Sequence, residues 1–231
     1  MSHITGIRAV SFDADGTLWD FQKVMRHSLG FVLSELGRLD PPAAAVLDIE
    51  KMMATRNTVA AELKGKTASL EAVRLEAFRR TLQEIDRADD DLARRLNDVY
   101  LMHRFEDIEL YPDVLPTLRV LGQRYTLGLV SNGNSYPERC GLDGVFRFVV
   151  FSQDHGVEKP DPEIYRIALR QAGCSPEELL NVGDSLQNDV IGAASAGVRS
   201  AWLNRNGVSN DTGARPDFEI ESLQELVDIL Q

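Results

Sequence analysis

The sequence predicts an α/β protein in which helices cover both faces of a mainly parallel β-sheet and an all-helical insert follows the first strand. Two observations lead to this fold class. Short apolar runs rich in β-branched residues alternate with helical patterns over the second half of the chain, whereas a long stretch near the N-terminus has no strand-like run. The length of 231 residues suits a core domain with an inserted module.

Five short apolar runs are the predicted strands. They lie at residues 7–12, 126–130, 148–151, 180–182 and 200–203. Helical patterns with start and stop signals lie between the later runs. Asp161 is the expected N-cap of a helix that opens with Pro162. Ser175 and Glu178 have the spacing of a capping box and predict the start of a further helix, and Gly197 suits a C-terminal stop.

The predicted insert is helical nearly throughout. One run places its apolar residues on a single helical face, namely Phe21, Val24, Met25, Leu29, Val32 and Leu36. A second run does so with Leu75, Phe78, Leu82 and Ile85. Asp40-Pro41-Pro42 and Lys64-Gly65-Lys66 mark breaks between helices. We therefore predict a core of residues 1–17 and 108–231 and a helical cap domain of residues 18–107.

Composition limits the partners and the compartment. A formal net charge of −11 argues against nucleic acid or an anionic membrane as a partner, because both repel an acidic surface. The chain has only two cysteines, Cys140 and Cys174, which suits a reducing compartment. No apolar run approaches the roughly 20 residues of a membrane span, and the N-terminus leads straight into a strand. We expect a cytoplasmic enzyme of undetermined oligomeric state that acts on a small molecule.

Polar residues follow the predicted strands at places that converge in such a fold. Ligands of an open parallel sheet bind beyond the carboxyl ends of its strands. Asp13, Ser131 and Asp184 each follow a strand directly, and Lys159 lies on the loop after another. Residues far apart in the sequence are therefore expected to meet at one edge of the sheet, and an insert that leaves after Asp15 would stand above that edge.

The first of these segments carries two carboxylates, Asp13 and Asp15. Side chains alternate along a strand, so both would point the same way if the strand continued, and Gly16 then allows a sharp turn. A carboxylate can attack phosphorus and form an aspartyl-phosphate, and a second carboxylic acid can protonate the leaving alkoxide and then take a proton from water. The alternative is an acidic cluster that caps a turn. The sequence DADGT after an apolar run favours catalysis.

Two further segments can bind a phosphoryl group. Ser131, Asn132 and Gly133 end a strand with a hydroxyl and backbone N–H groups, although such a turn alone is more often structural. Lys159 precedes Pro160 and a capped helix, and its charge would neutralise phosphate and stabilise the nucleophile. An isolated lysine is usually a solvated surface charge, so the interpretation depends on the whole set of segments.

The last segment, GDSLQND, supplies ligands for a hard cation. Asp184 follows a strand and could coordinate a divalent ion together with Asp13, since Mg²⁺ prefers oxygen ligands. Asn188 and Asp189 are placed to orient ligands or waters, and Asp189 also suits a helix N-terminus. Several carboxylates facing a phosphate dianion repel it at short range. A cofactor Mg²⁺ and Lys159 would offset that repulsion, and Mn²⁺ accepts similar ligands.

Taken in order, DADGT, SNG, KPDP and GDSLQND resemble the four signature motifs of the haloacid dehalogenase-like hydrolase superfamily. The helical insert is similar to that of members with a helical, C1-type cap. The resemblance implies a Rossmann-like core with Asp13 as the nucleophile and Asp15 as the acid/base. It further implies two sets of ligands: Ser131, Asn132 and Lys159 for the substrate phosphate, and Asp13, Asp184 and the backbone carbonyl of Asp15 for Mg²⁺.

These inferences predict a Mg²⁺-dependent phosphatase that hydrolyses a small phosphorylated metabolite through an aspartyl-phosphate. A sugar phosphomutase of the same fold is the main alternative. A haloacid dehalogenase is less favoured because true dehalogenases typically lack an acid at the position of Asp15, and a non-catalytic binding protein would have lost catalytic groups. The substrate stays open. The cap residues that could reach the substrate are Arg26, His27, Arg56, Asn57, Lys64 and Lys66.

Overall fold

The computed structural model describes residues 3–63, 65–67 and 69–230. Contacts divide the chain into two compact units, one of Met1–Asp20 with Glu109–Gln231 and one of Phe21–Ile108. We call them the core unit and the helical unit. Lys64, part of a predicted helix break and a predicted substrate contact, lies outside the described residues. No helix among the described residues combines the length and the apolar character that crossing a membrane requires.

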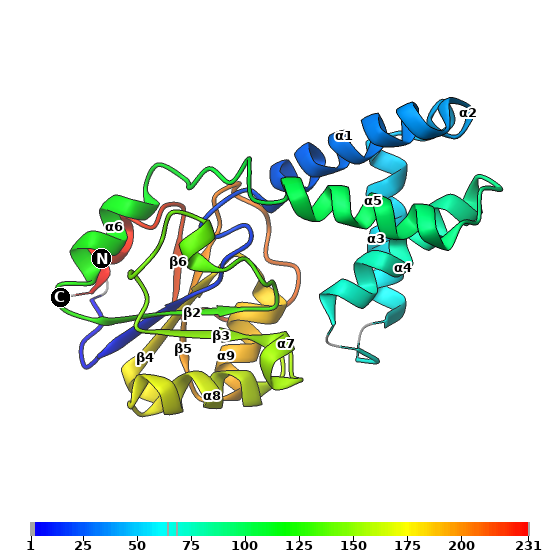
Figure 1. The fold of residues 1–231 in the computed structure, drawn as a ribbon. Helices are drawn as coiled ribbons and strands as arrows, with labels where there is room; N and C mark the ends of the chain where they lie inside the picture. The colour runs from blue at the N-terminus through cyan, green and yellow to red at the C-terminus, as the bar shows by residue number, and fades with distance from the viewer. Residues whose placement is uncertain (1–2, 64, 68, 231) are drawn as a thin grey trace. The chain divides into compact units, whose positions relative to one another are not determined.

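The core unit is built on one six-stranded sheet in the order β3-β2-β1-β4-β5-β6, with every neighbouring pair parallel (Figure 1). Its strands are β1 (Ala9–Phe12), β2 (Thr126–Ser131), β3 (Phe148–Phe151), β4 (Leu179–Gly183), β5 (Arg199–Leu203) and β6 (Phe218–Ile220). The predicted α/β fold class is confirmed. Strand β6 was not predicted, because only three residues form it and one of them, Glu219, is charged and exposed.

Helices cover both faces of this sheet. They are α6 (Val114–Leu121), α7 (Ser152–His155), α8 (Pro162–Ala172), α9 (Gly192–Ser195) and α10 (Glu225–Ile229), with short helical turns at Pro137–Arg139, Pro176–Glu178 and Leu186–Ile191. Helix α8 packs against α9 and against β2 and β3, whereas α6 packs against α10. Figure 1 shows α8 and α9 on one face of the sheet and α6 on the other.

One of the two predicted helix starts is confirmed and the other is not. Helix α8 begins as expected, because the carboxylate of Asp161 accepts a hydrogen bond from the backbone N–H of Glu163 at 2.8 Å. The capping box is also present, and the N–H of Ser175 donates to Oε2 of Glu178 at 2.9 Å. The prediction of a helix there is nevertheless wrong. The helical segment ends after a single 3₁₀ turn, Pro176–Glu178, because β4 already begins at Leu179.

The helical unit contains α1 (Phe21–Leu39), α2 (Pro41–Ala44), α3 (Ile49–Leu63), α4 (Leu70–Glu84) and α5 (Asp90–His103), and its described residues include no strand. The predicted apolar face of α1 packs into its own core with α4 and α5. Leu82 of α4 is fully buried there, while Phe21 at the start of α1 is only partly buried. Asp40 caps α2 by accepting a hydrogen bond from the N–H of Ala43 at 3.0 Å.

Close packing of β2 against β3 depends on a glycine in the sheet interior. Gly128 lies opposite Phe148 in the strand register. A Cβ at Gly128 would stand 2.0 Å from the ring of that phenylalanine, which is itself buried. No side chain fits at this position without moving the ring.

Gly128→Ala should therefore destabilise the core unit by about 1–3 kcal/mol through overpacking. Denaturant unfolding of both proteins would measure the difference. Gly30→Ala is the control, because a Cβ on that residue of α1 meets nothing within 4 Å, and alanine is the better helix former by about 0.5–1 kcal/mol. Equal unfolding midpoints for wild type and Gly128→Ala would contradict this account of the sheet.

Candidate active site

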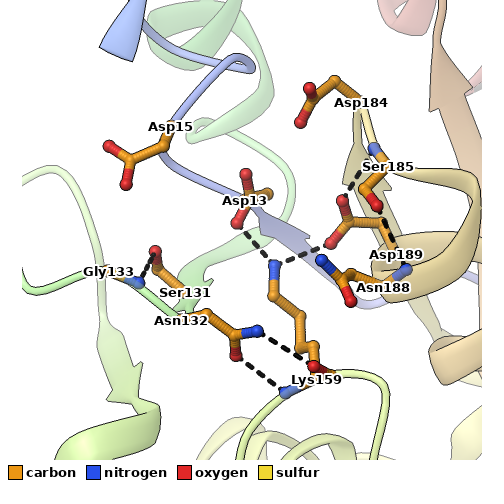
Figure 2. A pocket seen from close by; sticks show the side chains of 10 residues that line it. All are labelled: Asp13, Asp15, Ser131, Asn132, Gly133, Lys159, Asp184, Ser185, Asn188 and Asp189. Carbon is orange, nitrogen blue, oxygen red and sulfur yellow. Dashed lines mark hydrogen bonds and ion pairs between the residues drawn. The ribbon is translucent and has the colours of Figure 1, made fainter. Parts of the chain in front are cut away.

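The loop after β1 places Asp13 at the carboxyl end of the sheet. The backbone N–H of Asp13 donates to the carbonyl of Val182 at 2.8 Å, so the residue continues the pairing of β1 with β4. The chain then turns through Gly16, whose φ is +86°. Because the strand does not continue, the two carboxylates do not point the same way, and Figure 2 shows that of Asp15 directed away from Asp13. Its Oδ1 instead accepts a hydrogen bond from Nε1 of Trp19 at 2.9 Å.

Lys159 is the centre of the charged groups in this site. Its side chain is 2% exposed, and Nζ lies 2.5 Å from Oδ1 of Asp13 and 2.7 Å from Oδ1 of Asp189 (Figure 2). The side-chain amide of Asn132 fixes the backbone of Lys159 from both sides: its Oδ1 accepts from the lysine N–H at 2.7 Å, and its Nδ2 donates to the lysine carbonyl at 2.9 Å. Asn132, predicted to bind phosphate, thus also positions the lysine.

The turn after β2 faces Asp15. The hydroxyl of Ser131 accepts a hydrogen bond from the N–H of Gly133 at 2.9 Å, which closes the turn. A Cβ at Gly133 would lie 2.7 Å from Oδ2 of Asp15, so only glycine leaves room for that carboxylate. The predicted phosphate-binding hydroxyl and the predicted acid/base are therefore close to each other.

The segment after β4 brings in the remaining acidic groups. The buried carboxylate of Asp189 accepts from the N–H of Ser185 at 3.1 Å, in addition to its ion pair with Lys159. Asp184 is exposed, and its Oδ1 accepts from the hydroxyl of Thr17 at 3.4 Å. The N–H of Asn188 donates to the hydroxyl of Ser185 at 3.2 Å. The helical turn after Ser185 therefore places Asp189 inward, whereas Asp184, which precedes this turn, lies exposed at the edge of the site.

These segments line one pocket of about 220 Å³. Every residue predicted for the site lines this pocket, namely Asp13, Asp15, Ser131, Asn132, Lys159, Asp184, Asn188 and Asp189. Gly133 and Ser185 also line it. Pockets for drug-sized ligands usually measure roughly 300–1,000 Å³. The pocket in the core unit is smaller, so its size suits one polar group and a few waters rather than a whole large ligand.

The electrostatics of this pocket are dominated by excess negative charge. Burial raises the pKa of Asp13, Lys159 opposes the rise, and the charges of Asp189 and Asp184 add to it. Although Asp184 is exposed, partial desolvation of its carboxyl and repulsion from Asp189 raise its pKa to about 6. Burial alone would lower the pKa of Lys159, but the neighbouring Asp13 and Asp189 outweigh it and raise that pKa. One ammonium does not balance the carboxylates around it.

The donor set fits a hard divalent cation. Asp13, Asp184 and Asp189 each offer a carboxylate oxygen, and these oxygens lie within 4.8 Å of one another. Both oxygens of Asp189 are already engaged by Lys159 and Ser185, so this carboxylate suits an orienting role. Asp13 and Asp184 are the better ligands. A cation between them would offset both the burial and the repulsion from neighbouring carboxylates, which together raise the two pKa values.

Some contacts in the site had no clear signal in the sequence. Asn181 in the middle of β4 is fully buried, and its Nδ2 donates to the carbonyl of Asp189 at 3.1 Å. Its Oδ1 accepts from the hydroxyl of Ser11 in β1 at 2.8 Å. The signal that was available is a polar residue at the centre of each of two apolar strands, where an unpaired polar group would be costly.

The comparisons with known proteins agree with this fold. The family model for haloacid dehalogenase-like hydrolases matches residues 7–197, and the chain belongs to this family. A structure of 2-haloacid dehalogenase from Pseudomonas syringae superposes with a TM-score of 0.79 at 31% identity, covering 96% of this chain and 97% of that one. The Bacillus subtilis protein YfnB, solved with bound magnesium, gives 0.78 at 26% identity, with 97% and 99% covered.

Among curated proteins, glyceraldehyde 3-phosphate phosphatase of Methanopyrus kandleri is 38% identical over 139 residues, which is 55% of this chain and 59% of that protein. The chain thus spans less than two thirds of the length of this relative. The predicted family is confirmed. The similarity extends to a phosphatase and to a dehalogenase, so the reaction has to be argued from the site.

Lys159→Met should lower the free energy of unfolding by about 3–5 kcal/mol, because it leaves buried carboxylates without their cation. The measurement is denaturant unfolding in the presence of EDTA. Arg170→Met on α8 is the matched control, since that arginine is 62% exposed in a surface pair with Glu163 and should cost little. If both variants unfold at the same denaturant concentration, Lys159 is not the charge that holds the site together.

Proposed function

We propose that this protein is a Mg²⁺-dependent phosphatase that hydrolyses a small phosphorylated metabolite through an aspartyl-phosphate. The observation that carries the proposal is the contact of Lys159 Nζ with Asp13 in a small pocket that Asp15 also lines. Lys159 opposes the rise in the pKa of Asp13 that burial and the neighbouring carboxylates cause, and its ammonium belongs to the lining of the pocket in which a phosphoryl oxygen would bind. The similarity to a phosphatase over 55% of the chain supports the same reaction class.

The proposed reaction has two steps. An oxygen of the Asp13 carboxylate attacks phosphorus, the new O–P bond forms, and the ester P–O bond breaks, while Asp15 gives its proton to the leaving alkoxide. In the second step Asp15, now ionised, takes a proton from water as that water attacks phosphorus. The aspartyl O–P bond breaks, which releases inorganic phosphate and restores both carboxyl groups. Ser131 and Lys159 bind phosphoryl oxygens in both steps.

Bound Mg²⁺ would supply positive charge against the phosphate dianion and the transferring oxygens. Asp13, Asp184 and the backbone carbonyl of Asp15 are the residues that would hold it, as the family resemblance implies. Asn188 and Asp189 would orient the residues around it. Residues 18–107 are proposed to act as a cap that limits the access of water during the reaction.

A second candidate, haloacid dehalogenase activity, is favoured by the 31% identity to the Pseudomonas enzyme over nearly the whole chain. Displacement of a halide from carbon requires a carboxylate nucleophile but no acid for the leaving group. Here Asp15 has a fixed place, with Oδ1 bound by Trp19 and Oδ2 beside Gly133. A positioned second carboxyl group favours phosphoryl transfer. A phosphomutase would use the same groups and would differ in its product.

A panel of phosphorylated metabolites and p-nitrophenyl phosphate should release inorganic phosphate with Mg²⁺ present and should not do so in EDTA. Chloride or bromide release from 2-haloacids is measured in parallel. Halide release without phosphate release would overturn the phosphatase proposal, and conversion of a sugar phosphate to its isomer would favour the mutase.

Asp13→Asn should abolish turnover and leave the fold intact, because an amide does not attack phosphorus. Phosphate release assays, with circular dichroism to monitor folding, test this expectation. Asn188→Ala, also in the pocket, is the comparison, since a group that only orients its neighbours should reduce the rate by about 10–100-fold rather than abolish it. Retained activity in Asp13→Asn would exclude Asp13 as the nucleophile.

Asp15→Asn should slow hydrolysis of alkyl phosphates by about 10²–10⁴-fold, the usual contribution of general acid–base catalysis. The loss in the first step should be smaller for p-nitrophenyl phosphate, because its leaving group departs without a proton. Single-turnover kinetics on both substrates separate this step from hydrolysis of the intermediate. Equal losses on the two substrates in that step would count against a general acid.

A further inference from the structure

The two connections between the core unit and the helical unit leave the core side by side. Asp20 ends the first core segment and Glu109 begins the second. Next to these ends, the N–H of Tyr111 donates to the carbonyl of Leu18 at 2.9 Å, and Trp19 forms an antiparallel bridge with Leu110. The outgoing and returning chains are therefore paired with each other just beside the loop that carries Asp15.

Arg205, on the loop after β5, contacts both connections. Its Nη2 donates to the carbonyl of Thr17 on the outgoing chain at 3.2 Å. Its Nη1 and Nη2 form a bidentate pair with the carboxylate of Asp113 after the returning chain, both at 2.9 Å. The guanidinium also lies over the ring of Tyr111, with 4.2 Å between Cζ and the ring centroid. A planar fork with several donors is needed to make all three contacts at once.

The carboxylate partner of this arginine is itself fixed. Oδ2 of Asp113 accepts from the hydroxyl of Ser222 and from the N–H of Leu223, each at 2.8 Å. Burial alone would raise the pKa of Asp113, but the hydrogen bonds from Arg205, Leu223 and Ser222 outweigh it and hold that pKa below its usual value. The pair is largely buried, with side-chain exposures of 18% for Arg205 and 11% for Asp113. It is thus a rigid anchor rather than a mobile surface ion pair.

From Thr17 the contacts run directly to the catalytic groups. The N–H of Thr17 donates to the carbonyl of Ala14 at 3.2 Å, and its hydroxyl donates to Asp184 at 3.4 Å. The next residues of the same turn lead to Trp19, whose indole N–H holds Asp15. Arg205 does not line the pocket, so any effect it has on the reaction must pass through this turn.

We propose that Arg205 is a positioning residue that holds the two connections of the helical unit together and thereby fixes the turn that presents Asp15. Its anchor, Asp113, shares this role. No chemistry is assigned to the guanidinium. The inference rests on the proposed phosphatase function for its kinetic test, but the paired connections and their contacts with Arg205 can be tested without any activity.

The kinetic test compares Arg205→Met, Arg205→Lys and Asp113→Asn. Displacement of a catalytic group by about 1 Å costs on the order of 100-fold, so Arg205→Met should lower kcat on alkyl phosphates by about 10–100-fold with KM little changed. The first-step loss on p-nitrophenyl phosphate should be smaller, because the turn presents the general acid. Arg205→Lys should recover part of the rate. Arg8→Met, which removes a surface pair with Glu178, is the control and should behave like wild type.

The structural test is amide hydrogen exchange followed by mass spectrometry on the same variants. Peptides covering residues 14–20 and 109–114 should exchange faster in Arg205→Met and Asp113→Asn than in wild type or Arg8→Met, while β2 and α8 stay unchanged. Unchanged exchange in these peptides would overturn the proposal. So would equal first-step losses on both substrates, since these indicate general destabilisation.

The two proposals fail in different ways. If the wild type hydrolyses no phosphate ester, the proposed function fails, and hydrogen exchange alone decides the role of Arg205. If Arg205→Met does not fold, Arg205→Lys and Asp113→Asn carry the same comparison, because each removes the bidentate contact but keeps a polar or charged side chain at both positions.

Discussion

The ion pairs of Lys159 with Asp13 and Asp189 are the interaction on which the site depends. A lysine that is 2% exposed between two buried carboxylates is stable only because each charge compensates the others. Several chain segments meet to make this possible: the loop after β1 supplies Asp13, the turn at Leu186–Ile191 supplies Asp189, and Asn132 after β2 holds the backbone of Lys159. Fold and site are therefore coupled, since Asp13, the proposed nucleophile, is held by the same contacts that join these segments.

How far the sequence could predict this protein follows from the physics of each element. Strands β1 to β5 are apolar runs, so the fold class was predictable, whereas β6 is too short and too polar to stand out. The pocket residues were predictable because polar groups at the ends of parallel strands converge. The particular side-chain contacts were not predictable. Nothing in the order of residues shows that Trp19 binds Asp15, or that Arg205 meets Asp113 across 92 positions.

The direction of Asp15 shows why alternation along a strand has to be used with care. The pattern predicts parallel side chains only while the strand lasts, and β1 ends at Phe12. The chain leaves the strand before it reaches Asp15, and the two carboxylates then face different groups: Asp13 faces Lys159, and Asp15 faces Trp19 and Gly133. For a nucleophile and an acid this separation is useful, because the two groups must reach different atoms of a substrate.

The central place of β1 in the sheet has a consequence for how the chain folds. Ala9 pairs with Thr126 of β2 on one side and with Leu179 of β4 on the other. In the sequence, the whole helical unit lies between β1 and β2, so it is synthesised before the first strand partner of β1. During synthesis, β1 therefore has no strand to pair with until β2 has been made, while the helices of Phe21–Ile108 can pack against one another. Asp13, the proposed nucleophile, is thus synthesised before both strand partners of β1 and reaches its final surroundings only after β2 and β4 have been made.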